Sequence, residues 1–179
     1  MRKQRQHRQC GGCCNGPDDY DGGVIQRFTI NAPKEVVYKA FIDRIWYKNI
    51  PFGVAPDKLM ETDLSDSLDI EYPLRLILCK MIQETIYDAK SSEYIKYKVE
   101  SYLMPTSEYR AAVDFKDYYD DKLQIQCCRL IWTAQYNFKW SSCNACCPLL
   151  AIAFRKCMEY CYQMMAGALK TQVEIKKEK

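Results

Sequence analysis

The stretch that decides the fold is residues 81–140, MIQETIYDAKSSEYIKYKVESYLMPTSEYRAAVDFKDYYDDKLQIQCCRLIWTAQYNFKW. It predicts four consecutive strands, at 81–91, 93–103, 107–116 and 122–140, because runs rich in apolar and aromatic residues are separated by short polar or turn-forming breaks. Short breaks favour antiparallel neighbours, so these residues are expected to form a meander.

Apolar and polar residues alternate along these strands, which predicts a sheet with one buried face. Arg129, Thr133 and Asn137 belong to the polar face of the last strand. Its apolar face contains Cys128, Leu130, Trp132, Ala134, Tyr136, Phe138 and Trp140. An apolar face of this length must be covered by another element.

The cover is predicted at residues 149–173, which have the spacing of an amphipathic helix. At 1.5 Å for each residue this helix is nearly ~40 Å long, enough to cross the whole sheet. Its apolar stripe is Leu150, Phe154, Met158, Cys161, Met165 and Leu169.

The chain before residue 81 supplies the remaining elements. A strand is predicted at 24–30, and a helix follows it up to Trp46, with Asn31 as N-cap and Pro33 in the first turn. Residues 51–56 are expected to form a loop or a short second helix. Two more strands are predicted, at 58–64 and 74–79.

Size and composition predict one ordinary globular domain in this chain of 179 residues, 48% of them hydrophobic and 27% charged. We place this domain at 24–175, with a flexible basic tail that contains cysteines at 1–23 and a disordered basic end at 176–179. The net charge of +3 is concentrated at the two ends, and no basic stripe with interleaved aromatic residues is present. Nucleic acid is therefore not an expected partner.

The first twenty residues lack the apolar core of a secretory signal, and no stretch has the ~20 apolar residues that span a bilayer. The sequence therefore predicts a cytoplasmic protein whose eleven cysteines are thiols, metal ligands or acylation sites rather than a disulfide framework.

The predicted order of elements resembles the helix-grip fold of the START/birch-pollen-allergen (SRPBCC) superfamily, which includes the polyketide cyclase/dehydrase and lipid-transport group. Four motifs carry the resemblance. They are Ala32-Pro33-x-x-Val36-x-x-Ala40-Phe41 followed by Trp46, the hairpin IQETIYDAKSSEYIKYKVES, the late strand LIWTAQYNF, and the helix end LKTQVE.

The resemblance implies an α+β fold, in which a curved antiparallel sheet wraps around a long C-terminal helix and two shorter helices follow the first strand. It also implies a cavity between sheet and helix that binds, and in some members transfers, a hydrophobic small molecule or lipid. Two other functions stay open. One is a cyclase- or dehydrase-like enzyme that uses Glu84 and a cavity tyrosine; the other is a co-chaperone-like interaction protein without a cavity.

Glu84 is the weak candidate for a catalytic group. It is in phase with Ile82 and Ile86 on the apolar face, where desolvation would disfavour its charged form unless it were paired. Lys80 has the same phase and is one candidate partner. The alternative is a glutamate that reaches solvent or pairs with a surface cation.

The predicted ligand-binding residues line the space between sheet and helix. Tyr97, Trp132 and Tyr136 are the leading wall candidates, and the soft side chains of the helix suit irregular apolar ligands. Ordinary core packing is the alternative for each. The full set is Lys80, Ile82, Glu84, Tyr97, Val113, Trp132, Ala134, Tyr136, Phe154, Met158, Cys161 and Met165.

Several kinds of chemistry are not expected. His7, the only histidine, lies in the tail, so a Ser-His or Cys-His nucleophile pair and a His-based zinc motif are excluded from the domain. No glycine-rich phosphate loop is present, and no cofactor is predicted. Binding is therefore favoured over catalysis.

Two similar cysteine clusters leave three interpretations open. The pairs Cys10/Cys13 and Cys143/Cys146 could supply the four thiolates of a zinc site. Acylation of the tail beside its basic run would give peripheral membrane association. Free thiols are the third interpretation. The clusters are Cys10, Cys13 and Cys14, and Cys143, Cys146 and Cys147.

Overall fold

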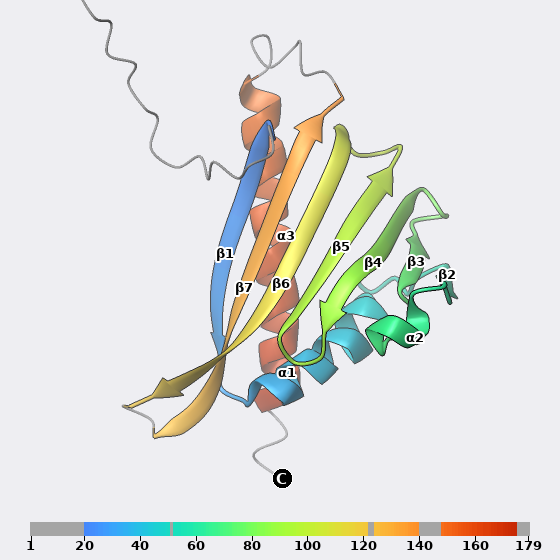
Figure 1. Cartoon of the computed structure of the whole chain (residues 1–179). Helices are drawn as coiled ribbons and strands as arrows, with labels where there is room; N and C mark the ends of the chain where they lie inside the picture. The colour runs from blue at the N-terminus through green and yellow to red at the C-terminus, as the bar shows by residue number, and fades with distance from the viewer. Residues whose placement is uncertain (1–19, 51, 122–123, 140–147, 175–179) are drawn as a thin grey trace, which may run out of the picture.

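The protein is built around one curved sheet of seven antiparallel strands, with a long helix lying across one face (Figure 1). The computed structural model describes residues 20–50, 52–121, 124–139 and 148–174. The strands are β1 (Gly22–Ile30), β2 (Lys58–Met60), β3 (Leu74–Ile77), β4 (Ile82–Lys90), β5 (Tyr94–Ser101), β6 (Thr106–Asp120) and β7 (Ile125–Phe138). The helices are α1 (Lys34–Ala40), the π-helix η1 (Phe41–Trp46), α2 (Ser65–Leu68) and α3 (Pro148–Glu174).

The strand order is β1-β7-β6-β5-β4-β3-β2, which confirms the predicted meander and the helix-grip arrangement. The two longest strands, β6 and β7, pair from Thr106 opposite Phe138 to Asp120 opposite Ile125. The first strand closes onto the last, with Gly22 opposite Tyr136 and Ile30 opposite Cys128. Every pairing is antiparallel, including that of the first strand with the last.

The strand β1 begins two residues before the predicted strand and takes in two glycines that we placed in the tail. At Gly22 a Cβ atom would lie 2.7 Å from the ring of Tyr136, so the ring can pack here only against a residue without a side chain. Asp21 ties the start of the strand to β7, because its amide donates to Asn137 Oδ1 (2.9 Å) and its carboxylate accepts from the amide of Phe138 (2.9 Å).

The helix after β1 runs through α1 into η1 and ends at Trp46, as predicted, but Asn31 is not its N-cap. Pro33 holds that position in an extended conformation, and its carbonyl accepts from the amides of Val36 (3.1 Å) and Val37 (3.2 Å). The second short helix is α2, which follows β2, whereas residues 52–57 form turns and loop. Of the two alternatives predicted for residues 51–56, the described residues 52–56 show the loop, and α2 was not located in the sequence because a single helical turn has little periodicity.

The core lies between the sheet, α3 and the α1–η1 segment. Phe41 of η1 makes edge-on contacts with Phe115 and Trp132, and Trp46 packs edge-on against Tyr97. The helix α3 lies behind β1, β7 and β6 in Figure 1, while α1 and η1 cross beneath the other strands. Together, α3 and the α1–η1 segment therefore cover one face of the sheet. Among the described residues, no helix is long and apolar enough to cross a membrane.

Candidate functional site

The centre of the sheet–helix interface is a cluster of aromatic side chains from three strands and α3. The ring of Trp132 stacks on Tyr162, with ring centroids 4.6 Å apart and ring planes 14° apart. Trp132 Nε1 donates to the hydroxyl of Tyr97 at 3.0 Å, and the hydroxyls of Tyr109 and Tyr162 share a hydrogen bond. Tyr97 and Trp132, two of the predicted wall residues, therefore contact each other, and a helix side chain contacts the sheet directly at this level.

The three tyrosines of this cluster are almost completely buried. Burial raises the pKa of Tyr97, of Tyr109 and of Tyr162, since the phenolate would lose its hydration. The negative charge of Glu84 acts on all three in the same direction. Each hydroxyl is consequently protonated at physiological pH and can donate one hydrogen bond.

The sheet side of the interface is formed by the predicted residues of β6 and β7. Val113, Ala134 and Tyr136 are all buried. Ala134 lies directly opposite Ala111, so two small side chains are neighbours on the inner face. The residues beside this alanine pair include Trp132 and Tyr109, which contact Tyr162 of the helix.

The burial of α3 changes along its length. Met165 is buried with Tyr162, Leu169 and Val173 in the C-terminal half. The predicted residues of the N-terminal half, Phe154, Met158 and Cys161, are only partly buried, although they pack on the core. Partly buried apolar residues of the strands and their turns include Phe28 in β1, Ile82 and Ala89 in β4, and Met104 in the β5–β6 turn. Along α3, apolar surface beside the core is therefore most accessible in the N-terminal half.

Glu84 is paired with Arg75, which is its direct neighbour across β3 and β4. Arg75 Nε donates to Glu84 Oε2 at 2.5 Å, and Nη2 forms an ion pair with the same oxygen. The Arg75 side chain is 6% exposed and that of Glu84 is 13% exposed. The apolar-face position predicted for Glu84 thus carries a carboxylate neutralised by an arginine, which removes the need for an unpaired buried charge.

Lys80 does not pair with Glu84. It is an exposed residue of the turn between β3 and β4, and its backbone amide donates to Asp57 Oδ2 at 2.9 Å. Leu78, Cys79 and Lys80 all have positive φ angles, of 53°, 56° and 63°, so the turn is left-handed. The predicted pairing of Lys80 with Glu84 was wrong, because Arg75 occupies the position opposite Glu84.

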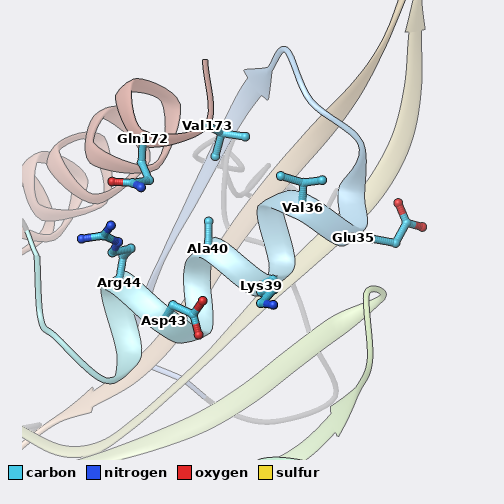
Figure 2. A pocket seen from close by; sticks show the side chains of 8 residues that line it. All are labelled: Glu35, Val36, Lys39, Ala40, Asp43, Arg44, Gln172 and Val173. Carbon is cyan, nitrogen blue, oxygen red and sulfur yellow. The ribbon is translucent and has the colours of Figure 1, made fainter. Parts of the chain in front are cut away.

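A pocket of about 400 Å³ lies elsewhere, between the outer side of α1–η1 and the last turns of α3 (Figure 2). It contains none of the predicted site residues. The charged residues around it, Glu35, Lys39, Asp43 and Arg44, form no ion pair with any described residue. Its other lining residues are Val36, Ala40, Gln172 and Val173. This charged rim suits a polar ligand better than an apolar one.

The cysteine clusters at 10–14 and 143–147 lie outside the described residues, so zinc binding and acylation stay predictions. Within the described part of the chain, no group of three or more His, Cys, Asp or Glu side chains is placed to hold a metal. The cysteines described there, Cys79, Cys127, Cys128, Cys157 and Cys161, are all free thiols.

Comparisons with known proteins place the fold. No family model matches the sequence, and a search of curated proteins finds no match. A solved protein from Nitrosospira multiformis has a TM-score of 0.59 at 11% identity, covering 88% of this chain and 100% of its own. A START superfamily protein from Mycobacterium smegmatis has a TM-score of 0.58 at 11% identity, covering 85% and 97%.

A third solved structure, Ara h 8.0201, has a TM-score of 0.57 at 7% identity and covers 83% of this chain and 97% of its own. Similarity at these identities defines the fold. The chain has the helix-grip fold, as the order of its predicted elements implied.

Sequence reasoning missed Tyr109, Arg75 and Tyr162. The predicted helix stripe passes through Cys161 and leaves out its neighbour Tyr162, whereas the buried stripe shifts by one residue at this point. The position of Arg75 opposite Glu84 depends on the register set by the four-residue turn at 78–81, and the predicted strands at 74–79 and 81–91 run into that turn.

Proposed function

We propose that the protein binds a hydrophobic small molecule between the N-terminal half of α3 and the strand ends that face it. One observation carries the proposal: the stripe of α3 that packs on the core is buried from Tyr162 onward but only partly buried at Phe154, Met158 and Cys161. Partly exposed apolar residues next to a core supply an apolar surface that a ligand can bury at about 25 cal/mol per Å².

The side chains in this region suit a ligand of irregular shape. Met158 and Cys161 are polarizable, and methionine has three rotatable bonds with which it adapts to its neighbours. Phe154 is held by edge-on contacts with Tyr136 at 4.9 Å and Phe138 at 5.8 Å between ring centroids. A rigid aromatic base with soft side chains beside it is typical of sites for apolar molecules.

The tyrosine cluster supports a ligand that also carries an oxygen acceptor. The hydroxyls of Tyr109 and Tyr162 share a hydrogen bond, and the Tyr97 hydroxyl accepts from Trp132 Nε1. Because a hydroxyl can donate as well as accept, Tyr97 can also donate its own proton to an acceptor such as a carbonyl or hydroxyl oxygen of the ligand.

A specific observation also favours a second function, that of an interaction protein with a filled core. The direct stacking of Trp132 on Tyr162 occupies the middle of the space in which the cavity was predicted. An enzyme that uses Glu84 is less well supported, because Arg75 holds the carboxylate in an ion pair.

Native mass spectrometry of the purified full chain, before and after addition of an environment-sensitive apolar dye, tests the first proposal. Met158→Trp should fill the proposed site and weaken dye binding by about tenfold, since the added ring occupies ligand space. Ala153→Trp on the exposed side of the same helix is the matched control. Equal dye binding by both variants and the native protein, or no binding at all, would support the filled-core function instead.

A further inference from the structure

The two edge strands of the sheet differ in how well their open edges are protected. In the strand order β1-β7-β6-β5-β4-β3-β2 the edges belong to β1 and β2, and Figure 1 shows no described strand beyond β1. An edge carries unpaired backbone N–H and C=O groups, which proteins protect with short strands, charged residues, prolines or bulges. The strand β2 has only three residues and begins with Lys58, so its edge is protected.

The strand β1 has little of this protection. It is nine residues long, contains no proline, and pairs with β7 in one unbroken register from Gly22 to Ile30. Arg27 is its only charged residue. Ile25, which is 38% exposed, adds an apolar side chain to the outer face. A long and regular edge of this kind is a template for another extended backbone.

The backbone groups that β1 directs outward can be assigned from the end of β7. The amide of Lys139 points to the β6 side, where the carbonyl of Pro105 accepts it at 2.8 Å. The amide of Phe138 points to the β1 side, where Asp21 Oδ2 accepts it at 2.9 Å. Successive residues of a strand direct their backbone groups to opposite edges, so the even-numbered residues of β7 bond to β1, and their partners are even-numbered too. The odd-numbered residues of β1 therefore direct their N–H and C=O groups away from the sheet.

We propose that two copies of the chain bind each other through β1, as antiparallel edges about a twofold axis at Gln26. The outward-directed residues are Gly23, Ile25, Arg27 and Thr29, all exposed. In this register Gly23 lies opposite Thr29 of the other copy, and Ile25 lies opposite Arg27. Every outward donor and acceptor of both strands is then paired. Because the same strand serves both copies, the contact closes as a dimer.

Neighbouring registers are less favourable. A shift by one residue would place the outward groups opposite even-numbered residues, whose groups are already bound to β7. A shift by two residues in one direction would place Arg27 opposite Arg27 of the other copy, and like charges directly opposite are destabilising. The same shift in the other direction would place Thr29 opposite Asp21, which lies outside the strand.

The side chains of β1 also suit pairing with a second copy. On the inner face Val24 lies opposite Phe28, a ring that is only partly buried and can gain a contact there. On the outer face the alkyl stem of Arg27 can cover Ile25 of the other copy. The strand is thus complementary to itself in charge and in polarity, which favours a second copy over an unrelated peptide.

This inference goes beyond the proposed function and does not depend on it, because the dye site was placed at α3. Sedimentation equilibrium of the full chain tests it, and the native protein should show a concentration-dependent equilibrium of monomer and dimer. Ile25→Lys places a second cation opposite Arg27 of the other copy, whereas Ile25→Glu places a carboxylate there. Each dimer contains two such pairs, so the Kd of Ile25→Glu should be at least about tenfold lower than that of Ile25→Lys.

The two variants lose the same apolar side chain, and a second pair controls for net charge. Leu64→Lys and Leu64→Glu make the same charge changes at a position that is also 38% exposed, and both should keep a Kd close to the native value. A native chain that stays monomeric up to about 1 mM would overturn the inference. Equal Kd values for the two Ile25 variants would also overturn it, because the copies would then meet at another surface.

Cross-linking tests the register without relying on charge. Gln26 lies opposite itself at the axis, with Cβ atoms about 4.5–5.5 Å apart, so Gln26→Cys should form a disulfide-linked dimer under mild oxidation. Thr29→Cys, in the same strand but opposite Gly23 of the other copy, should give no more linked dimer than the native chain on a non-reducing gel. Equal linking of the two cysteine variants would contradict the proposed pairing.

Discussion

Arg75 binds Trp46 through both the main chain and the side chain of that residue. Its guanidinium carbon lies 4.3 Å from the centroid of the indole ring, and its Nη1 donates to the Trp46 carbonyl at 2.7 Å. The same Nη1 donates to the carbonyl of Ile45 at 2.5 Å. Both carbonyls lie at the end of the helical segment, where few helical amides remain to bind them, and that of Ile45 also accepts from the amide of Asn49 at 3.2 Å. Arg75 thus caps η1 from β3 and, through Glu84, joins it to β4.

Removing this arginine should be strongly destabilising. Arg75→Met leaves the Glu84 carboxylate without its cation and removes a charged donor from the carbonyls of Ile45 and Trp46, so we expect a loss of about 3–5 kcal/mol in the free energy of unfolding. Urea denaturation followed by circular dichroism measures this loss. The surface pair Lys98–Glu100, with side chains 47% and 59% exposed, is the control, and Lys98→Met should cost less than about 1 kcal/mol.

A double-mutant cycle separates pairing from packing. Arg75→Met combined with Glu84→Leu removes both charges, and we expect it to be more stable than Arg75→Met alone, because no unpaired carboxylate remains. If the two single losses simply add in the double variant, the Arg75–Glu84 pair does not couple β3 to β4 energetically.

The stacked pair Trp132–Tyr162 should anchor α3 to the sheet. Tyr162→Ala should lower the free energy of unfolding by about 3–5 kcal/mol, because it leaves a large void beside the indole ring. Tyr162→Phe keeps the ring and should cost about 1 kcal/mol for the lost hydroxyl contacts. Tyr160→Ala, at a position 62% exposed on the same helix, is expected to stay within about 0.5 kcal/mol of the native protein.

The buried tyrosines predict a loss of stability at high pH. Burial raises the pKa of Tyr97, Tyr109 and Tyr162 in the folded protein, whereas an unfolded tyrosine titrates near about 10. The unfolded chain therefore gives up protons first, and stability that is fully present below about pH 10 falls as the pH rises further.

The urea midpoint measured from about pH 8 to pH 11 should show this fall. Tyr162→Phe should make the dependence shallower, since one of the titrating groups is gone. Tyr102→Phe changes a tyrosine that is 93% exposed and should leave the dependence as it is in the native protein. An identical slope in all three proteins would contradict the assignment of the effect to the buried cluster.

The described thiols should differ in reactivity. Burial raises the pKa of Cys128 to about 12 and that of Cys161 to about 11, while Cys79 and Cys157 are exposed. Because the thiolate is the reactive form, brief alkylation near neutral pH should label Cys79 and Cys157 before Cys161, and Cys128 only after unfolding.

Cleavage with trypsin places these cysteines in three different peptides, so that mass spectrometry can locate the label. Cys79 is the only cysteine of peptide 76–80, Cys157 and Cys161 share peptide 157–170, and Cys127 and Cys128 share peptide 123–129. Mass spectrometry should therefore find peptide 157–170 with a single label in the folded protein. Early double labelling of that peptide, or rapid labelling of peptide 123–129, would show that α3 or β7 opens readily.

The order and type of the elements could be predicted from the sequence, since they depend on local periodicity. The alternation of Trp132, Ala134 and Tyr136 identifies β7 and its buried face, and these three residues are indeed buried. The predictions were weaker wherever periodicity is short. The strand predicted at 58–64 is only Lys58–Met60, and the single turn α2 at Ser65–Leu68 was not located in the sequence.

The sequence by itself determined that one apolar sheet face would meet one apolar helix stripe, because a period of two and a period of 3.6 can be seen in any short window. Only the tertiary structure decided that Tyr162 stacks on Trp132 and that Arg75, rather than Lys80, neutralises Glu84. Such contacts join residues far apart in the chain, and their geometry depends on sheet curvature, strand register and helix placement, which leave no local pattern in the sequence.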